Sequence, residues 1–257
     1  MSQEFLLYDH PAQMEPLLPG EHKLGPLLEL SHDLIRLGER LAGRYRPDTL
    51  PGLRRLLRAM NSYYSNRIEG QHTFPLDIER ALHNDYAQDE DQARRQRLAL
   101  AHMATEEQLE YRSTQWTNAQ VWTPQMLADI HQDLFARLPQ ADLEAGALGD
   151  DAIEPGRWRT REGRVGRHAA PAAGPLPFVL YRWSGFYSGV RRGELQLVAM
   201  AAAHQRLAWI HPFRDGNGRV ARLHSHLVLT HMGLSNGLWS PLSGFARSQE
   251  RYYALLA

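Results

Sequence analysis

The sequence predicts an all-α fold with one small β-hairpin. Leucines recur three and four residues apart in several segments, which is the period of an amphipathic helix. Prolines and capping hydroxyls begin such segments, and glycines or prolines end them. The region 143–174 differs, because it is rich in Gly, Arg and Pro and has no helical period. Roughly eight helices and one hairpin account for most of the chain, which defines the all-α class.

The N-terminal half is expected to hold four helices. The first begins at Pro26 and follows a stripe of leucines to Gly43 (Leu27, Leu30, Leu34, Leu37 and Leu41). The second covers 53–64 and ends in the polar stretch 66–73. Helix-like segments follow at 77–83 and 92–111.

Thr123 and Pro124 are a strong helix start. That helix has an apolar stripe formed by Leu127, Ile130, Leu134 and Leu138. A hairpin is expected from 157–160 to 164–165, turning at Gly163. Helices resume near Phe178, at 194–210 and at 216–231, before a loop at 233–241.

The last residues, 252–257, read as the middle of a helix, so we expect a chain shortened at its C-terminus. The predicted division is an N-terminal helical region, 1–113, and a core domain, 114–257.

Composition excludes several classes of protein. The 257 residues include 29 Lys+Arg and 29 Asp+Glu, so no net positive field attracts nucleic acid, which argues against it as a partner. Cysteine is absent, which excludes a disulfide framework and thiol catalysis. No run approaches the ~20 apolar residues of a membrane span, and the N-terminus lacks a secretory signal. These features indicate a soluble, cytoplasmic protein without a membrane partner.

The densest functional signal is the stretch His211–Arg222, HPFRDGNGRVAR. Its Gly-Asn-Gly run precedes a predicted helix, and a helix N-terminus after a glycine-rich loop binds anions. Arg219 and Arg222 share a helix face and offer planar forks to phosphate oxygens. Asp215 supplies a hard oxygen ligand for Mg²⁺, and His211 can act as a general base. Together these groups suit transfer of a phosphate ester to a hydroxyl.

This stretch resembles the signature of Fic-domain proteins, His-x-Phe-x-Asp/Glu-Gly-Asn-Gly-Arg-x-x-Arg, at every fixed position. The likeness extends from about Met60 to the C-terminus. Within it, 123–134 resembles the early core helix of the family, and 203–210 resembles the helix that leads into the signature. Members share a helical fold with a β-hairpin flap, and most characterised ones transfer AMP from ATP to a protein Ser, Thr or Tyr hydroxyl.

The resemblance implies a role for each signature residue. His211 would deprotonate the target hydroxyl, and Asp215 would bind Mg²⁺. The groups that would hold the phosphates are Gly216, Asn217, Gly218, Arg219 and Arg222. The flap position, which lines the nucleotide and clamps the target peptide, is occupied by Val165, Gly166, Arg167 and His168. Tyr252 and Tyr253 resemble a pair near the adenine.

A second motif, Ser65–Gly70, resembles the inhibitory motif of the family, Ser/Thr-x-x-x-Glu-Gly/Asn, on a helix placed at about 51–70. Taken alone, it could be a helix ending at glycine with a solvated glutamate. Beside the signature, Ser65, Glu69 and Gly70 imply autoinhibition. Glu69 would pair with Arg222, displace the γ-phosphate of ATP and misorient the α-phosphate.

Several alternatives stay open. Glu69 could serve removal of AMP, and the chain could be a nucleotide-regulated binding module without transferase activity. A phosphorylating branch of the family departs from Gly-Asn-Gly-Arg, so the intact pattern favours AMP transfer. His224, His226 and His231 are better explained as helix-face residues than as metal ligands, because no third ligand is nearby in sequence. The sequence does not identify the protein target, and the chain itself is one candidate. The oligomeric state does not follow from the sequence either, and a homo-oligomer remains open.

Overall fold

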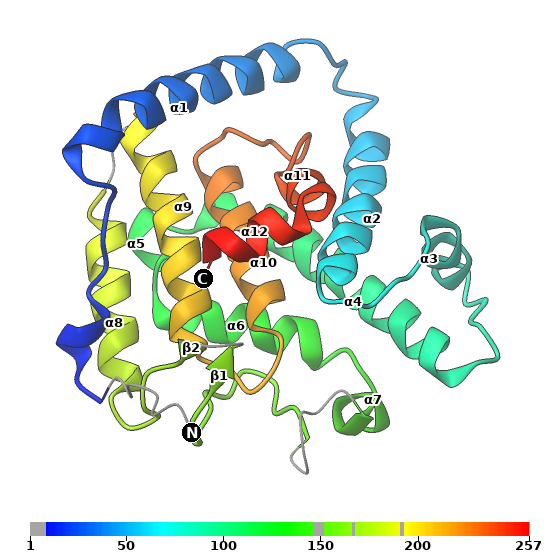
Figure 1. Cartoon of the computed structure of the whole chain (residues 1–257). Helices are drawn as coiled ribbons and strands as arrows, with labels where there is room; N and C mark the ends of the chain where they lie inside the picture. Colours follow the sequence, from blue (N-terminus) through cyan, green and yellow to red (C-terminus); the bar gives the residue numbers. More distant parts are fainter. Residues whose placement is uncertain (1–8, 146–151, 166–167, 191–192, 257) are drawn as a thin grey trace.

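The computed structural model describes residues 9–145, 152–165, 168–190 and 193–256, and within them the all-α prediction is confirmed (Figure 1). The helices in the N-terminal half are α1 (Glu21–Ala42), α2 (Leu50–Ile68), α3 (Pro75–Leu82) and α4 (Glu90–Arg112). The middle of the chain forms α5 (Asn118–Val121), α6 (Pro124–Phe135), α7 (Gln140–Ala145) and α8 (Leu176–Ser188). The last four are α9 (Gly193–Ile210), α10 (Asn217–His231), α11 (Leu242–Arg247) and α12 (Gln249–Leu256). Short 3₁₀ turns lie at Pro11–Met14 and Ser113–Gln115.

The hairpin exists, but it is displaced along the chain from its predicted position. Strand β1 (Arg164–Val165) pairs antiparallel with β2 (His168–Ala169). The prediction instead paired 157–160 with 164–165 around Gly163, and this pairing was wrong. Arg159 explains the difference: its side chain is buried and bonded to backbone carbonyls, so this stretch packs against the core. The short helices α5, α7 and α11 were missed because four to six residues are too few to show a period.

Helix α10 is the centre of the fold. Nearly every residue from Asn217 to Leu229 is buried, because α10 contacts α9, α4, α6 and α2. In Figure 1, α10 (orange) lies among α9 (yellow), α6 (green) and α2 (cyan). The core beside it includes Trp122 and Trp183, whose rings are 5.5 Å apart. A helix buried on all sides is held rigidly, so its N-terminus is a fixed platform for a site.

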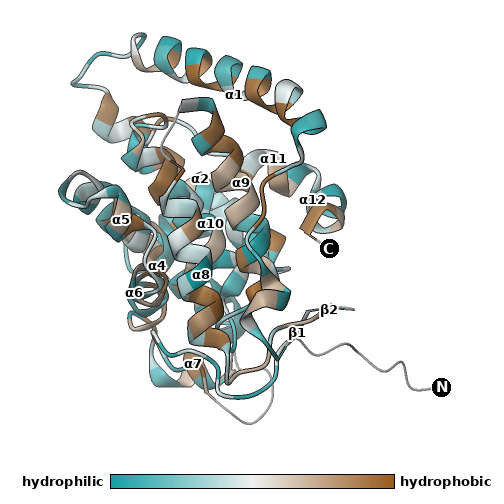
Figure 2. Cartoon of the chain, turned by 90° about the vertical axis from the view of Figure 1, so that its left-hand side faces the viewer, coloured by the Kyte–Doolittle hydropathy of each residue, from teal (hydrophilic) through white to brown (hydrophobic). Residues whose placement is uncertain are grey.

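Helix α1 begins at Glu21, five residues before Pro26, which therefore lies inside the helix. The middle of the predicted leucine stripe faces outward: Leu30 and Leu37 are 66% and 54% exposed, whereas Leu27 and Leu41 at its ends are half-buried. The inner face carries Ser31 and Gly38 instead, and a Cβ at Gly38 would lie 3.0 Å from the carbonyl oxygen of Leu234. In Figure 2, α1 runs along the top, and the brown bands of its ribbon mark hydrophobic residues between hydrophilic ones. Small residues thus set the closest packing of α1, and the leucines in the middle of the stripe remain exposed.

Helix α2 packs against α4 and α11. Its last residue, Ile68, forms a small apolar cluster with Ala246 and Tyr252 from the C-terminal helices. This contact fixes the end of α2 next to the N-terminus of α10. In the part of the chain that the structure describes, none of the helices has the length and apolarity needed to cross a bilayer. The division at residues 113 and 114 stays a prediction.

Candidate active site

The loop between α9 and α10 is closed by its own side chains. Asn217 accepts a hydrogen bond from the N–H of Phe213 and donates one to its carbonyl, both at 2.8 Å. His211 has φ +49° and Gly216 has φ +75°, so the backbone is left-handed at both of these positions. The amide of Asn217 therefore shapes the loop, and any contact of this residue with phosphate would come from its backbone N–H.

Gly216 is required by both its backbone and its surroundings. A Cβ added there would lie 2.4 Å from a ring carbon of Phe135, and a positive φ is costly for other residues. Phe213 is buried and stacks on His131, with ring centroids 4.1 Å apart and planes at 12°. Phe213 therefore anchors the loop in the core.

His211 follows directly from the end of α9. Burial lowers the pKa of its imidazole to about 4, although the carbonyl of Ala208 and the charge of Glu69 act in the opposite direction. The ring is consequently neutral at pH 7. A neutral imidazole can accept a proton, so the environment keeps His211 in the form that a general base needs.

Arg159 braces this loop from the region before the hairpin. Its Nε donates to the carbonyl of His211 at 2.8 Å, and its Nη2 donates to that of Pro171. The backbone N–H of Arg159 also donates to the carbonyl of Pro212 at 2.9 Å. Sequence reasoning missed this residue, because nothing in a glycine- and arginine-rich stretch distinguishes one buried arginine.

His131 of α6 positions the backbone of Asp215. Its Nδ1 accepts the N–H of Gly156 at 2.8 Å, so the ring proton is on Nε2, which donates to the carbonyl of Asp215 at 3.2 Å. Burial lowers the pKa of His131 to about 4, consistent with this neutral tautomer. The sequence placed His131 on a core helix but did not reveal this contact.

Asp215 is half-buried at the start of the anion-binding loop. Its Oδ1 accepts the N–H of Gly216 at 2.6 Å, which orients the carboxylate. One oriented carboxylate fits Mg²⁺, which is commonly held by one or two carboxylates and completes its shell with substrate phosphates and water. Asp215 therefore suits the magnesium role that the sequence implied.

Both arginines of α10 are buried, and both are bonded to the end of α2. Arg219 donates to Asn66 Oδ1 at 3.1 Å and to Gln71 Oε1 at 2.8 Å. Arg222 donates from Nε to Ser65 Oγ at 3.0 Å and from Nη2 to Glu69 Oε1 at 2.6 Å. Asn66 and Gln71 were not among the predicted site residues, because their partner lies about 150 residues away in sequence.

Glu69 lies against the first turn of α10. A Cβ added at Gly218 would be only 2.2 Å from Glu69 Oε1, so glycine is what permits the carboxylate to approach. Burial raises the pKa of Glu69, but the charges of Arg222 and Arg219 outweigh burial and the net pKa is lowered. A carboxylate thus occupies the helix N-terminus that the sequence assigned to phosphate.

Gly70 ends α2 in the left-handed conformation, with φ +74°. The N–H of Gly70 donates to the carbonyl of Arg67, and the N–H of Gln71 donates to that of Asn66. These two bonds form the glycine-terminated helix end known as the Schellman motif. Gly70 therefore turns the chain immediately after Glu69 and fixes where that carboxylate points.

Residues 121–229 match the model of the Fic/DOC family. The chain contains a Fic/DOC family domain. The match includes α6, α9 and α10 with the loop between the last two, and the α2 segment carrying Glu69 lies outside it.

Curated relatives and solved structures agree with the family match. "Protein adenylyltransferase Fic" of Drosophila mojavensis is 33% identical over 132 residues, which is 50% of this chain and 25% of that protein. The same-named protein of Drosophila virilis is 34% identical over 117 residues, covering 45% of this chain and 23% of its own length. The chain therefore matches only about a quarter of the length of these relatives.

Two solved structures share the fold. A Fic family protein from Desulfovibrio desulfuricans G20 aligns with a TM-score of 0.69 at 22% identity, covering 94% of this chain and 67% of that chain. Fic-1 from C. elegans aligns with a TM-score of 0.62 at 19% identity, covering 90% and 64% respectively. At these identities the likeness concerns the fold.

The two tyrosines near the C-terminus pack beside the Fic signature and bind other parts of the chain. The hydroxyl of Tyr252 lies 2.8 Å from His204 Nε2, and its ring stacks on Phe245. The hydroxyl of Tyr253 donates to the carbonyl of Ile68 at 2.6 Å. The pair predicted to lie near adenine thus holds the end of α2, and its contact with a nucleotide stays a prediction.

The hairpin of the Fic domain is described in part. The backbone of Val165 pairs with that of His168, while Gly166 and Arg167 lie outside the described residues. His168 Nε2 donates to the carbonyl of Trp209 at 2.9 Å, which attaches the second strand to α9. The hairpin is therefore next to the helix that ends just before His211, and the flap role of its residues stays a prediction.

Proposed function

We propose that this chain is an autoinhibited protein adenylyltransferase, which transfers AMP from ATP to a hydroxyl of a protein target. The observation that carries the proposal is the Glu69 carboxylate, which lies on Arg222 and against Gly218 at the N-terminus of α10. An anion held by a buried arginine at a helix N-terminus marks a site built for phosphate. The names of the curated relatives supply the class of reaction.

His211 would act as the general base. Its neutral imidazole takes the proton from a target Ser, Thr or Tyr hydroxyl, whose oxygen attacks the α-phosphorus of ATP. A bond forms between the target oxygen and this phosphorus, the bond to the bridging oxygen breaks, and pyrophosphate leaves. Arg159 keeps His211 in place by bonding its carbonyl.

Mg²⁺ would be held by Asp215, and when bound it would neutralise charge on the phosphates. The free N–H groups of the first turn of α10 would bind the phosphates around Gly218. Arg219 and Arg222 would take the outer phosphates once their bonds to α2 are released.

Glu69 would inhibit by competition. Its carboxylate and the γ-phosphate need the same guanidinium, since Arg222 is buried and its other bonds go to Ser65 and Tyr252. ATP bound without this contact would present its α-phosphate in the wrong orientation, and orientation alone is worth orders of magnitude in rate.

The test is transfer of label from ATP labelled at the α-phosphate. We expect Mg²⁺-dependent labelling of protein by the wild-type chain, and its loss in His211→Ala. His32→Ala is the matched control, because this exposed histidine of α1 lies away from the loop. Labelling that survives His211→Ala would refute the role of the base. Absence of labelling in every variant would favour a nucleotide-regulated binding module.

Removal of AMP is a second candidate function, because the charge of Glu69 interacts with His211 within the same site. A carboxylate beside that histidine could orient a water molecule toward a protein-bound phosphodiester. The test incubates protein that already carries AMP with the unlabelled wild-type chain. Release of AMP by the wild type and not by Glu69→Gln would support removal.

A further inference from the structure

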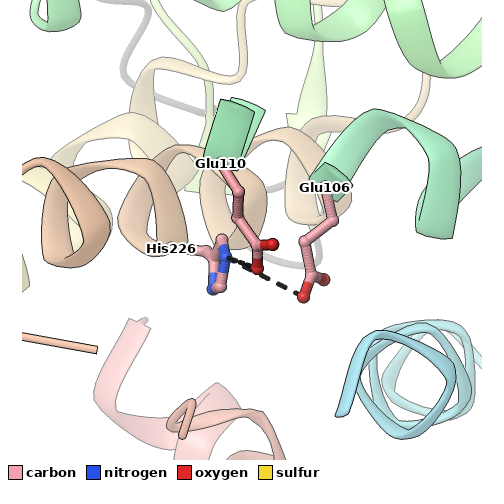
Figure 3. A group of neighbouring side chains, drawn as sticks. All are labelled: Glu106, Glu110 and His226. Carbon is pink, nitrogen blue, oxygen red and sulfur yellow. Dashed lines mark hydrogen bonds and ion pairs between the residues drawn. The ribbon is translucent and has the colours of Figure 1, made fainter. Parts of the chain in front are cut away.

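Three ionisable side chains meet inside the protein behind the arginine pair. Glu106 and Glu110 lie one turn apart on α4, and His226 on α10 faces both (Figure 3). Glu106 and His226 are almost fully buried, and the Glu110 side chain is 10% exposed. The proposed transfer reaction uses none of them.

The donor atoms have the spacing of a metal site. His226 Nε2 lies 3.1 Å from Glu110 Oε1 and 3.8 Å from Glu106 Oε1, and the donor atoms all lie within 4.8 Å of one another. Zinc bonds of about 2.1 Å in a tetrahedron place neighbouring ligands about 3.4 Å apart. Small rotations of the side chains would bring all three atoms onto one ion.

Both carboxylates are oriented by further residues on α2. Asn61 Nδ2 donates to Glu106 Oε1 at 2.7 Å. Arg58 donates to Glu110 Oε2 through Nε at 3.0 Å and Nη2 at 2.6 Å, leaving Oε1 directed at His226. Partners of this kind fix metal-ligating carboxylates in position. Arg58 also pairs with Glu107, whose Oε1 lies 2.5 Å from Arg58 Nη1 and offsets its charge.

An independent observation comes from His102, one turn before Glu106 on α4. Its ring is fully buried, and in the described parts of the chain neither ring nitrogen has a hydrogen-bond partner. His102 Nδ1 lies 3.8 Å from Glu106 Oε2, which likewise has no hydrogen-bond partner there. Buried polar atoms are nearly always paired, so this group of atoms is suited to binding a further ligand.

We propose that Glu106, Glu110 and His226 bind a first-row divalent cation such as Zn²⁺, with His102 positioned beside them to take a further coordination position. The imidazole favours Zn²⁺, Fe²⁺ or Ni²⁺ over Mg²⁺ and Ca²⁺, which prefer oxygen ligands. Glu110 also lines a surface pocket with Arg58 and Thr230, which offers a route of entry.

The other two histidines of α10 that invite a metal role are engaged elsewhere. His224 Nε2 donates to the carbonyl of Val121, and His231 Nδ1 donates to that of Ser113, each at 3.0 Å. Spacing along α10 argued against a metal site because no further ligand was nearby in sequence. The structure supplies those ligands from α4, more than a hundred residues away.

The ion would tie α4 to α10 and, through Asn61 and Arg58, to α2. His226 lies one helical turn after Arg222, so the site would hold the platform on which Arg222 and Glu69 meet. Its expected role is structural, and its presence does not depend on the transfer reaction.

The test measures metal in the intact chain. Protein loaded with Zn²⁺ and desalted should retain one ion per chain by elemental analysis, and Co²⁺ in its place should give visible absorption typical of nitrogen and oxygen ligands. His226→Gln and Glu106→Gln should lose the ion. Glu107→Gln is the matched control, since this exposed neighbour contacts Arg58 and not His226. Asp215→Ala should also retain the ion, which separates this site from the proposed magnesium position.

A second measurement, made on the wild-type chain, tests the site even if a variant fails to fold. Zn²⁺ should raise the melting temperature of the wild-type chain above its value in chelator, because an ion bound only by the folded state stabilises it. Retention well below one ion per chain, or equal retention by folded His226→Gln, would overturn the proposal. So would a melting temperature unchanged by Zn²⁺ together with an absent Co²⁺ absorption.

Discussion

Replacing Glu69 by glycine should release the proposed inhibition. The Glu69 carboxylate has no catalytic role in the proposed transfer. The hydrogen bond that it accepts from Arg222 is short, at 2.6 Å, and largely shielded from water. Hydrogen bonds to charged groups contribute about 1.5–3 kcal/mol. Since about 1.4 kcal/mol corresponds to a factor of ten, freeing Arg222 for the γ-phosphate should raise AMP incorporation by roughly 10- to 100-fold.

The assay is the initial rate of labelling from α-labelled ATP at saturating Mg²⁺. Glu69→Gln is the matched variant: it keeps the shape of the side chain and removes its charge, so its rate should lie between those of wild type and Glu69→Gly. Arg222 loses its only charged partner among the described residues in both variants. The melting temperature should therefore fall by a few degrees, and rates are measured below it. An unchanged labelling rate in Glu69→Gly would refute the competition and reduce Ser65–Gly70 to a helix end.

Three further results are expected. Gly216→Ala should lower the free energy of unfolding by about 2 kcal/mol or more, because its Cβ meets Phe135 at a positive φ; an unchanged urea midpoint would contradict the loop geometry. Tyr253→Phe loses the bond to the carbonyl of Ile68, which should loosen the end of α2 and raise labelling by about 2- to 10-fold at a cost of ~1 kcal/mol. Acid should destabilise the protein through histidines whose pKa values burial lowers to about 4. These are His131, His204, His211 and His224. As the pH falls from 6.5 toward 4, the unfolded chain binds protons that the folded chain does not. Each histidine then removes up to about 1.4 kcal/mol per pH unit, so a urea midpoint independent of pH between 7 and 5 would contradict their burial.

The sequence predicted what depends on neighbouring residues. The loop His211–Arg222, the helix end at Gly70 and the cap at Thr123 follow from local chemistry, and all are found where expected. Motif resemblance added the pairing of Glu69 with Arg222, and the structure contains this contact. That pairing joins segments about 150 residues apart and could not have been derived from spacing alone.

The sequence did not reveal contacts between distant segments that lack a motif. Arg159 and His131 support the loop through backbone carbonyls, which any sequence offers, so no residue type identifies the partner. The leucines of α1 have a helical period, but Ser31 and Gly38 allow closer packing and take the inner face. Periodicity located the helix, and only packing determined which face is buried.

The measurement that tests the central claim most directly is mass spectrometry of protein treated with ATP and Mg²⁺. Glu69→Gly chain is added to a lysate, and peptides are searched for AMP on Ser, Thr or Tyr, those of the chain itself included. We predict AMP adducts that are absent when the added chain is Glu69→Gly/His211→Ala. Adducts of equal abundance with both chains, or no adduct on any protein with folded Glu69→Gly, would contradict AMP transfer by this loop.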